Sequence, residues 1–120
     1  MIFQTIADLK LTPGTTTDNY SSVSGYTAAG DGGGGDFYWA NTSTETDNGG
    51  TIFAVTGTTT GRWKRLYTDH LNVEWFGAKG NGADDYAAFY NAQKVCLDEN
   101  LTLLASRKYL LQTSIDLRKI

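Results

Sequence analysis

The chain has 120 residues with 40% hydrophobic and 12% aromatic content, a length that suits one ordinary domain or two small ones. Fourteen glycines stand against a single proline, a composition that favours strands and turns. The net charge of −3 gives no electrostatic reason to expect nucleic acid or an anionic membrane surface as a partner.

Residues 3–14 predict a short N-terminal helix. Ile6 and Leu9 would share one face of it, and Pro13 with Gly14 would end it. The segment lacks the basic leader and the long apolar run of a secretory signal. No stretch of the chain approaches the ~20 apolar residues that span a bilayer, so we expect no membrane insertion.

Residues 15–70 predict a small antiparallel β unit that aromatic side chains hold together. Its first strand is rich in serine and threonine and has three positions expected to be buried: Tyr20, Val23 and Tyr26. Three more strands are expected between polar or glycine-containing turns: residues 36–40, their return strand 51–55, and 62–67. In the last strand, alternation places Trp63 and Arg65 on one side.

A glycine-rich loop precedes the strand at 36–40. Its five glycines are Gly30, Gly32, Gly33, Gly34 and Gly35. The loop lacks the lysine and the serine or threonine of a phosphate-binding loop, and no helical pattern follows it. Asp31 and Asp36 are possible calcium ligands, although their spacing fits no EF-hand. The favoured interpretation is a backbone role, in which the glycines adopt positive φ or let another chain pass closely. A carbohydrate or ion contact stays open.

The aromatic residues of this unit suggest two binding functions. Trp63 lies among three basic residues, as in a nucleic-acid site that combines phosphate contact with stacking. Trp39 with Tyr38 and Tyr26 could form a platform for a sugar, but in a small β unit such rings more often form the core. The acidic chain has no second basic patch. We therefore prefer an amphipathic strand with Trp63 inside and the basic tips in water.

From about residue 71 the pattern changes to a strand at 71–76, a glycine-containing loop, and a helix over residues 84–100. Asp84 suits the N-cap, Asp85 lies in the positive field of the helix start, and Asn100 can close the far end. One helical face is small and apolar and includes the only cysteine, which we expect to be buried: Ala88, Ala92, Val95 and Cys96. A lone cysteine excludes an intramolecular disulfide and a cysteine-cluster metal site.

Three short strands are expected after the helix, over residues 101–105, 108–112 and 113–117. Closely spaced short strands of this kind are typical of the first turn of a repeating structure, and a single turn cannot cover its own apolar faces. We therefore expect the natural polypeptide to continue beyond Ile120.

No pattern in the sequence indicates catalysis. His70 and Asp69 have no third partner, and His70 is expected to be an exposed histidine of a linker. The helix start explains the adjacent carboxylates Asp84 and Asp85, and no serine, cysteine or lysine stands in a nucleophile arrangement. The sequence indicates neither a cofactor nor a metal site.

Two parts of the chain are similar to known proteins. The stretch VEWFGAKGNGADDYAAFYNA (73–92), with LLASRKYLLQTSIDL (103–117), resembles the beginning of right-handed parallel β-helix proteins of the pectate-lyase superfamily. Asn81 replaces a common aspartate of that pattern, and Tyr86 stands where threonine is usual. The stretch GYTAAGDGGGGDFYW (25–39), with DNGGTIFAV and TGRWKRLY, is similar to the region before that helix in bacteriophage tailspikes.

The resemblance implies a trimeric phage tailspike or capsule depolymerase. In such proteins the N-terminal part attaches the spike to the virion, and a distal β-helix binds and cleaves bacterial surface polysaccharide. The implied partners are two sister chains and a tail, baseplate or adaptor protein, with assembly in the host cytoplasm and action outside the cell. The active site would lie beyond residue 120, so this segment would not itself be an enzyme.

The expected fold is mainly β with one amphipathic helix: an anchoring β unit over residues 1–70 and the helix-capped start of a β-helix over residues 71–120. Phe3, Ile6 and Leu9 are the candidates for virion docking, since a short terminal segment has little else to pack on. Around a threefold axis the glycine loop would let chains approach closely. Two alternatives stay open: a glycan-contacting part of a polysaccharide lyase or hydrolase, and a carbohydrate-binding module that uses Trp39 and Trp63.

Overall fold

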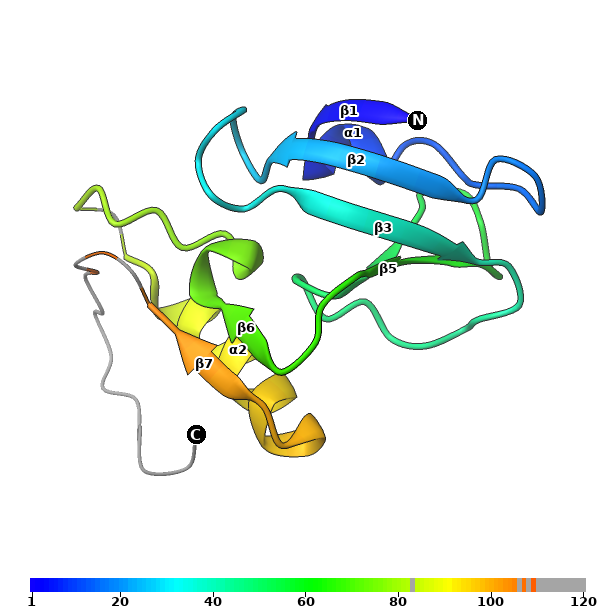
Figure 1. Cartoon of the computed structure of the whole chain (residues 1–120). Helices are drawn as coiled ribbons and strands as arrows, with labels where there is room; N and C mark the ends of the chain where they lie inside the picture. Colours follow the sequence, from blue (N-terminus) through cyan, green and yellow to red (C-terminus); the bar gives the residue numbers. More distant parts are fainter. Residues whose placement is uncertain (83, 106, 108, 110–120) are drawn as a thin grey trace.

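The computed structural model describes residues 1–82, 84–105, 107 and 109. Its elements are β1 (Ile2–Thr5), α1 (Ile6–Leu9), β2 (Tyr20–Gly25), β3 (Gly35–Ala40), β4 (Ile52–Ala54), β5 (Arg62–Arg65), β6 (His70–Asn72), the 3₁₀ helix η1 (Val73–Phe76), α2 (Tyr86–Glu99) and β7 (Thr102–Leu104). Figure 1 shows the sheet that contains β1, β2, β3 and β5 on one side of the molecule, and α2 with β6 and β7 on the other. The chain is mainly β with one long helix, as predicted.

The larger sheet has the strand order β1-β2-β3-β5-β4. The pairs β2–β3, β3–β5 and β5–β4 are antiparallel, whereas β1 pairs with β2 in parallel. The prediction of a helix from residue 3 was therefore wrong for β1, and only Ile6–Leu9 is helical. Phe3 and Thr5 have side chains that suit a strand, and the Thr5 hydroxyl accepts a hydrogen bond from the Asp8 N–H at 3.3 Å where the helix begins.

The predicted strands β3, β4 and β5 are confirmed, but their neighbours differ from the expected hairpin. β5 lies between β3 and β4, so residues 51–55 do not return beside residues 36–40. The eleven residues between β3 and β4 (41–51) form a connection long enough for another strand to lie between the two. A cross-strand pair explains which strand does so: Trp39 lies directly opposite Trp63, with ring centroids 5.1 Å apart in an edge-to-face arrangement.

A first hydrophobic core, here called the sheet core, covers the inner face of this sheet. It consists of Ile6, Leu9, Val23, Phe37, Trp39, Phe53, Val55 and Trp63. The indole N–H of Trp63 donates to the Thr12 carbonyl at 2.8 Å, so the largest buried ring also has its polar group satisfied. The prediction for Tyr20 was wrong, because the inward positions of β2 are Ser21, Val23 and Gly25 and Tyr20 is 49% exposed.

A second hydrophobic core, the helix core, lies between α2, η1 and the parallel pair β6–β7. Its buried members are Leu71, Val73, Phe76, Ala78, Ala88, Phe89, Ala92, Val95 and Cys96. The predicted strand at 71–76 ends at Asn72, whose side chain accepts from the Glu74 N–H at 2.9 Å and starts η1. The predicted burial of Cys96 and the strand within 101–105 are confirmed. The strands expected at 108–112 and 113–117 fall largely or wholly outside the described residues.

The start of α2 differs from the predicted cap. Asp85 is the N-cap residue, yet its buried carboxylate turns away and accepts from the N–H groups of Lys79 and Gly80, at 2.9 and 3.0 Å. Asp84 supplies the bond at the helix start instead, because its carboxylate accepts from the Tyr86 N–H at 3.0 Å. At the other end Asn100 adopts the left-handed conformation with φ 56°, as predicted.

Candidate functional site

The glycine-rich loop between β2 and β3 folds around the carboxylate of Asp31. Oδ1 accepts from the N–H groups of Tyr26 and Gly33, at 2.8 and 2.9 Å. Oδ2 accepts from those of Thr27 and Ala28, at 2.8 and 3.1 Å. Desolvation raises the pKa of Asp31, but these four donors outweigh it and hold the pKa below its ordinary value. Backbone donors thus occupy the oxygens that a calcium ion would need.

The glycines of this loop have backbone conformations and close contacts of the kind that the prediction described. Positive φ angles occur at three of them: Gly30, Gly32 and Gly35. A Cβ on Gly33 would lie 2.6 Å from the Glu74 carbonyl oxygen, and one on Gly34 would lie 2.2 Å from that of Val23. The close approach at this loop is therefore to other segments of the same chain. An approach around a threefold axis stays a prediction.

The guanidinium of Arg65 is buried, which corrects the expectation that the basic side chains of β5 end in water. It shares the inner side of the strand with Trp63, as predicted, but only 3% of it is exposed. Burial lowers the pKa of Arg65 to about 9, so the guanidinium is still charged at neutral pH. Alternation along the strand identified the side on which Arg65 lies, but nothing in the sequence indicated that its head group would be enclosed.

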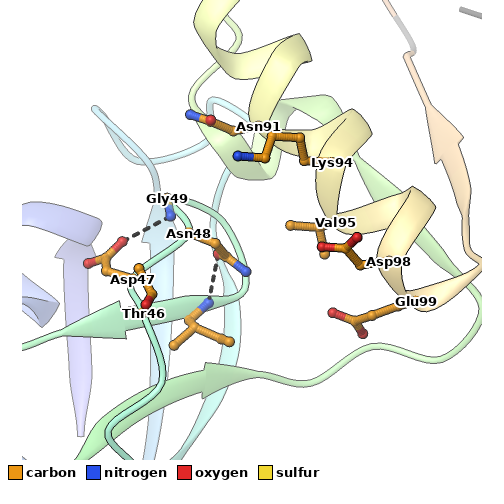
Figure 2. A pocket seen from close by; sticks show the side chains of 10 residues that line it. Thr46, Asp47, Asn48, Gly49, Asn91, Lys94, Val95, Asp98 and Glu99 are labelled. Atoms are coloured by element: carbon orange, nitrogen blue, oxygen red, sulfur yellow. Dashed lines mark hydrogen bonds between the residues drawn. The ribbon is translucent and has the colours of Figure 1, made fainter. Parts of the chain in front are cut away.

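A polar groove of about 490 Å³ separates the 46–52 loop from helix α2 (Figure 2). On the loop side, the Asp47 carboxylate accepts from the N–H groups of Gly49 and Ala54, at 2.9 and 3.0 Å. Asn48 accepts from three successive N–H groups, at 3.0, 2.8 and 3.0 Å. These contacts hold the loop wall in place, and neither side chain is left for chemistry.

The helix side of the groove presents Asn91, Lys94, Asp98 and Glu99 (Figure 2). The Glu99 carboxylate accepts a hydrogen bond from the Tyr67 hydroxyl. Burial and this bond raise the pKa of Tyr67 above its ordinary range. Among the described residues, no group of three or more histidine, cysteine or acidic side chains could hold a metal ion. The groove can offer hydrogen bonds to a polar ligand, but it contains no nucleophile with a base beside it.

The aromatic residues proposed for sugar stacking belong to the sheet core. Trp39 and Trp63 are both buried, so neither ring offers a face to a ligand. The aromatic rings exposed on the larger sheet are those of Tyr20 and Tyr38, which lie directly opposite each other on β2 and β3. The sequence missed Tyr20, because serine-rich alternation gives no strong signal for which side of β2 faces inward.

His70 was expected to lie in a linker, but it is the first residue of β6. Its Nδ1 lies 3.1 Å from an oxygen of the exposed Asp69, and its ring is 5.8 Å from that of Trp75. The bond to His70 lowers the pKa of Asp69. The Thr68 hydroxyl donates to the same Asp69 oxygen at 3.3 Å, and among the described residues no further acid–base side chain bonds to this exposed pair, so it does not form a catalytic arrangement.

The N-terminal docking candidates also lie elsewhere than expected. Ile6 and Leu9 are 3% and 0% exposed and belong to the sheet core, while Phe3 packs against that core. The segment therefore has a good surface to pack on, and Ile6 and Leu9 cannot also face a partner. Its most exposed large apolar residues are Ile2 and Leu11, at 85% and 68%, and Met1 is 40% exposed.

Among the described residues, no helix has both the length and the apolar character needed to cross a bilayer. The sequence model of a family described as "Phage tail protein small four-stranded beta-sheet domain" matches residues 2–68, which is more than half of the chain. This range contains all five strands of the larger sheet. No curated protein sequence matches the chain.

Solved tailspike structures are similar to the chain. Tailspike protein 2 from Escherichia coli O157:H7 bacteriophage CAB120 is 28% identical, with a TM-score of 0.68 over 79% of this chain and 12% of that one. The tailspike of Acinetobacter baumannii phage AM24 is 30% identical, with a TM-score of 0.60 over 77% of this chain and 15% of that one.

The tailspike gp49 of Acinetobacter baumannii phage Fri1, described as a capsular polysaccharide depolymerase, shares the fold. It is 19% identical, with a TM-score of 0.71 over 89% of this chain and 21% of that one. The chain thus spans only a small part of the length of each of these three proteins. The tailspike resemblance predicted from the sequence is confirmed, and the chain belongs to the family of phage tail proteins with the small four-stranded β-sheet domain.

Proposed function

We propose that this chain is the virion-attachment and trimerisation region of a phage tailspike, and that it positions a distal β-helix that binds or degrades bacterial polysaccharide. The family match over residues 2–68 carries the proposal. The parallel pairing of β6 with β7 through α2 supports the second half of it, because further parallel strands can continue such a pair.

The proposal includes a homotrimer and no catalytic activity in this region. The polar groove at α2 has no nucleophile arrangement, and the tryptophans that a carbohydrate-binding module would use are buried. The mass of the particle in solution should be three times that of one chain. Incubation of the 120-residue chain with capsular polysaccharide should release no new reducing ends, and a release above the no-protein blank would favour the glycan-degrading alternative.

We assign virion docking to the exposed residues of the N-terminal segment. Removing the whole segment would not test this role, because Ile6, Leu9 and the Thr12 carbonyl stabilise the sheet core. The sharper test is the double variant Ile2→Glu with Leu11→Glu in the intact spike. Both side chains point into solvent, so the spike should still fold and trimerise but should not be incorporated into virions.

Thr59→Glu with Thr60→Glu is the matched control, because this pair adds the same two charges at other exposed positions of this region. If virions incorporate the double variant and the control spike in equal amounts, the N-terminal segment does not mediate docking. Loss of the trimer in the double variant, with normal folding of the monomer, would instead assign these residues to the contact between sister chains.

A further inference from the structure

Arg65 lies where separate segments of the chain meet. Its Nε donates to the Gly50 carbonyl at 2.7 Å, its Nη2 to the Gly33 carbonyl at 3.1 Å, and its Nη1 to the Gly34 carbonyl. One side chain on β5 thus holds both the glycine-rich loop and the turn before β4. These three bonds need three donors fixed in one planar head group. A lysine ammonium on a flexible stem would not provide them.

The guanidinium also lies close to an aromatic ring from each core. Its Cζ is 4.7 Å from the ring centroid of Phe37 in the sheet core, and 4.8 Å from that of Trp75, which packs against the helix core. Within the part of the chain that the structure describes, Arg65 forms no ion pair with a carboxylate. Carbonyl dipoles and ring faces therefore stabilise its buried charge.

The surrounding glycines leave the space that this contact needs. A Cβ on Gly35 would lie 2.5 Å from Nη1 of Arg65. A Cβ on Gly50 would lie 2.3 Å from the ring of Phe76, a member of the helix core. A side chain at Gly35 would displace the guanidinium, and one at Gly50 would displace Phe76 and with it η1. The two glycines and Arg65 therefore determine how closely the two cores approach.

We propose that Arg65 is a clasp that couples the sheet core and the helix core into one cooperative folding unit. The alternative is that Arg65 only satisfies the carbonyls of two loops on the sheet side. The two cases differ in what happens to the helix core, which Arg65 contacts through the ring of Trp75. Loss of the clasp should let the helix core open while the sheet stays closed.

Native-state amide hydrogen exchange, followed residue by residue, measures this coupling. In the wild-type chain the slowest amides of α2 and of the β2–β3 ladder should exchange at the same opening equilibrium. In Arg65→Met the protection of the α2 amides should fall at least tenfold below that of the sheet amides. In Arg65→Lys the ratio should be intermediate, since the charge is retained but the planar donors are lost.

Arg62→Met is the control, because Arg62 is on the same strand and, within the described ranges, donates only to the Glu45 and Gly61 carbonyls of the sheet side. Its exchange ratio should equal that of the wild type. Equal losses of protection in both cores of Arg65→Met would overturn the proposal, as would independent exchange of the two cores in the wild type.

A second variant keeps the proposal testable if Arg65→Met does not fold. Trp75→Leu leaves the three donated hydrogen bonds in place and removes the ring that contacts both Arg65 and the helix core. It should lower α2 protection relative to the sheet in the same direction. An unchanged ratio in Trp75→Leu would show that the contact with Arg65 does not couple the cores.

Discussion

The substitution Asp31→Asn should destabilise the fold although it preserves the shape of the side chain. Each carboxylate oxygen of Asp31 accepts two backbone N–H groups. An amide has one oxygen and one NH₂ group, so whichever way it turns, two N–H donors must face another donor. The variant therefore loses two charge-assisted hydrogen bonds, and the remaining two lose their charge.

The expected loss in the free energy of unfolding is about 2 kcal/mol. A hydrogen bond to a charged group contributes about 1.5–3 kcal/mol, so two bonds would give roughly 3–6 kcal/mol if the site were enclosed. Asp31 is only partly buried, so water can solvate the freed donors and we reduce this value by about half or more. Urea unfolding at neutral pH, followed by tryptophan fluorescence, measures the difference.

Asp36→Asn is the control, because this exposed carboxylate accepts one hydroxyl bond, from Ser22 at 2.6 Å. It should cost less than about 0.5 kcal/mol, the usual range for exposed positions. If Asp31→Asn were as stable as this control, the carboxylate would not organise the glycine loop.

The same site predicts a pH dependence. The folded pKa of Asp31 lies below the ordinary value of 3.8, so its stabilising contribution is complete above 3.8 and is lost as the pH falls through the lower folded value. The stability difference between the wild type and Asp31→Asn should therefore shrink below about pH 4. A difference that stays constant into strong acid would contradict the assignment of the effect to the ionised carboxylate.

Three further substitutions test local packing by thermal or urea unfolding. Gly34→Ala places a Cβ 2.2 Å from a backbone carbonyl oxygen and should lower the free energy of unfolding by about 2–3 kcal/mol. Gly57→Ala should cost less, because a Cβ there meets no atom and only the positive φ is unfavourable. Equal costs would contradict the clash at Gly34. Asn100→Ala should lose about 1 kcal/mol because its φ of 56° is left-handed, whereas Asn100→Gly should not. Trp63→Phe should cost about 1–3 kcal/mol, because the Thr12 carbonyl loses its buried donor; a neutral effect would mean that water replaces the indole.

Periodicity predicted the parts of this fold in which a side chain's position follows from its neighbours in sequence. The face of Ala88, Ala92, Val95 and Cys96 follows from the helical repeat, and the inward side of β5 follows from strict alternation. Asn100 closes α2 because few other residues adopt a left-handed conformation so readily. These predictions depend on spacings of four residues or fewer.

The errors concern contacts that the short repeats of a helix or a strand do not determine. β1 is a strand because a neighbouring strand about twenty residues later accepts it in parallel, which no local pattern reveals. Asp85 turns from the helix it begins because the N–H groups of Lys79 and Gly80 lie nearby and need an acceptor. Ile6 and Leu9 are buried because the sheet provides a surface that the segment alone does not have.

The amino-acid order by itself determined the class of the chain, the places of α2 and of most strands, and the resemblance to tailspikes, because propensity and periodicity act over a few residues. Only the folded chain decided that Arg65 is enclosed, that Asp31 binds backbone rather than metal, and that the glycines make room for another part of the same polypeptide. Burial of a charge and close approach of two backbones depend on contacts with other segments of the folded chain, and local sequence patterns do not predict those contacts.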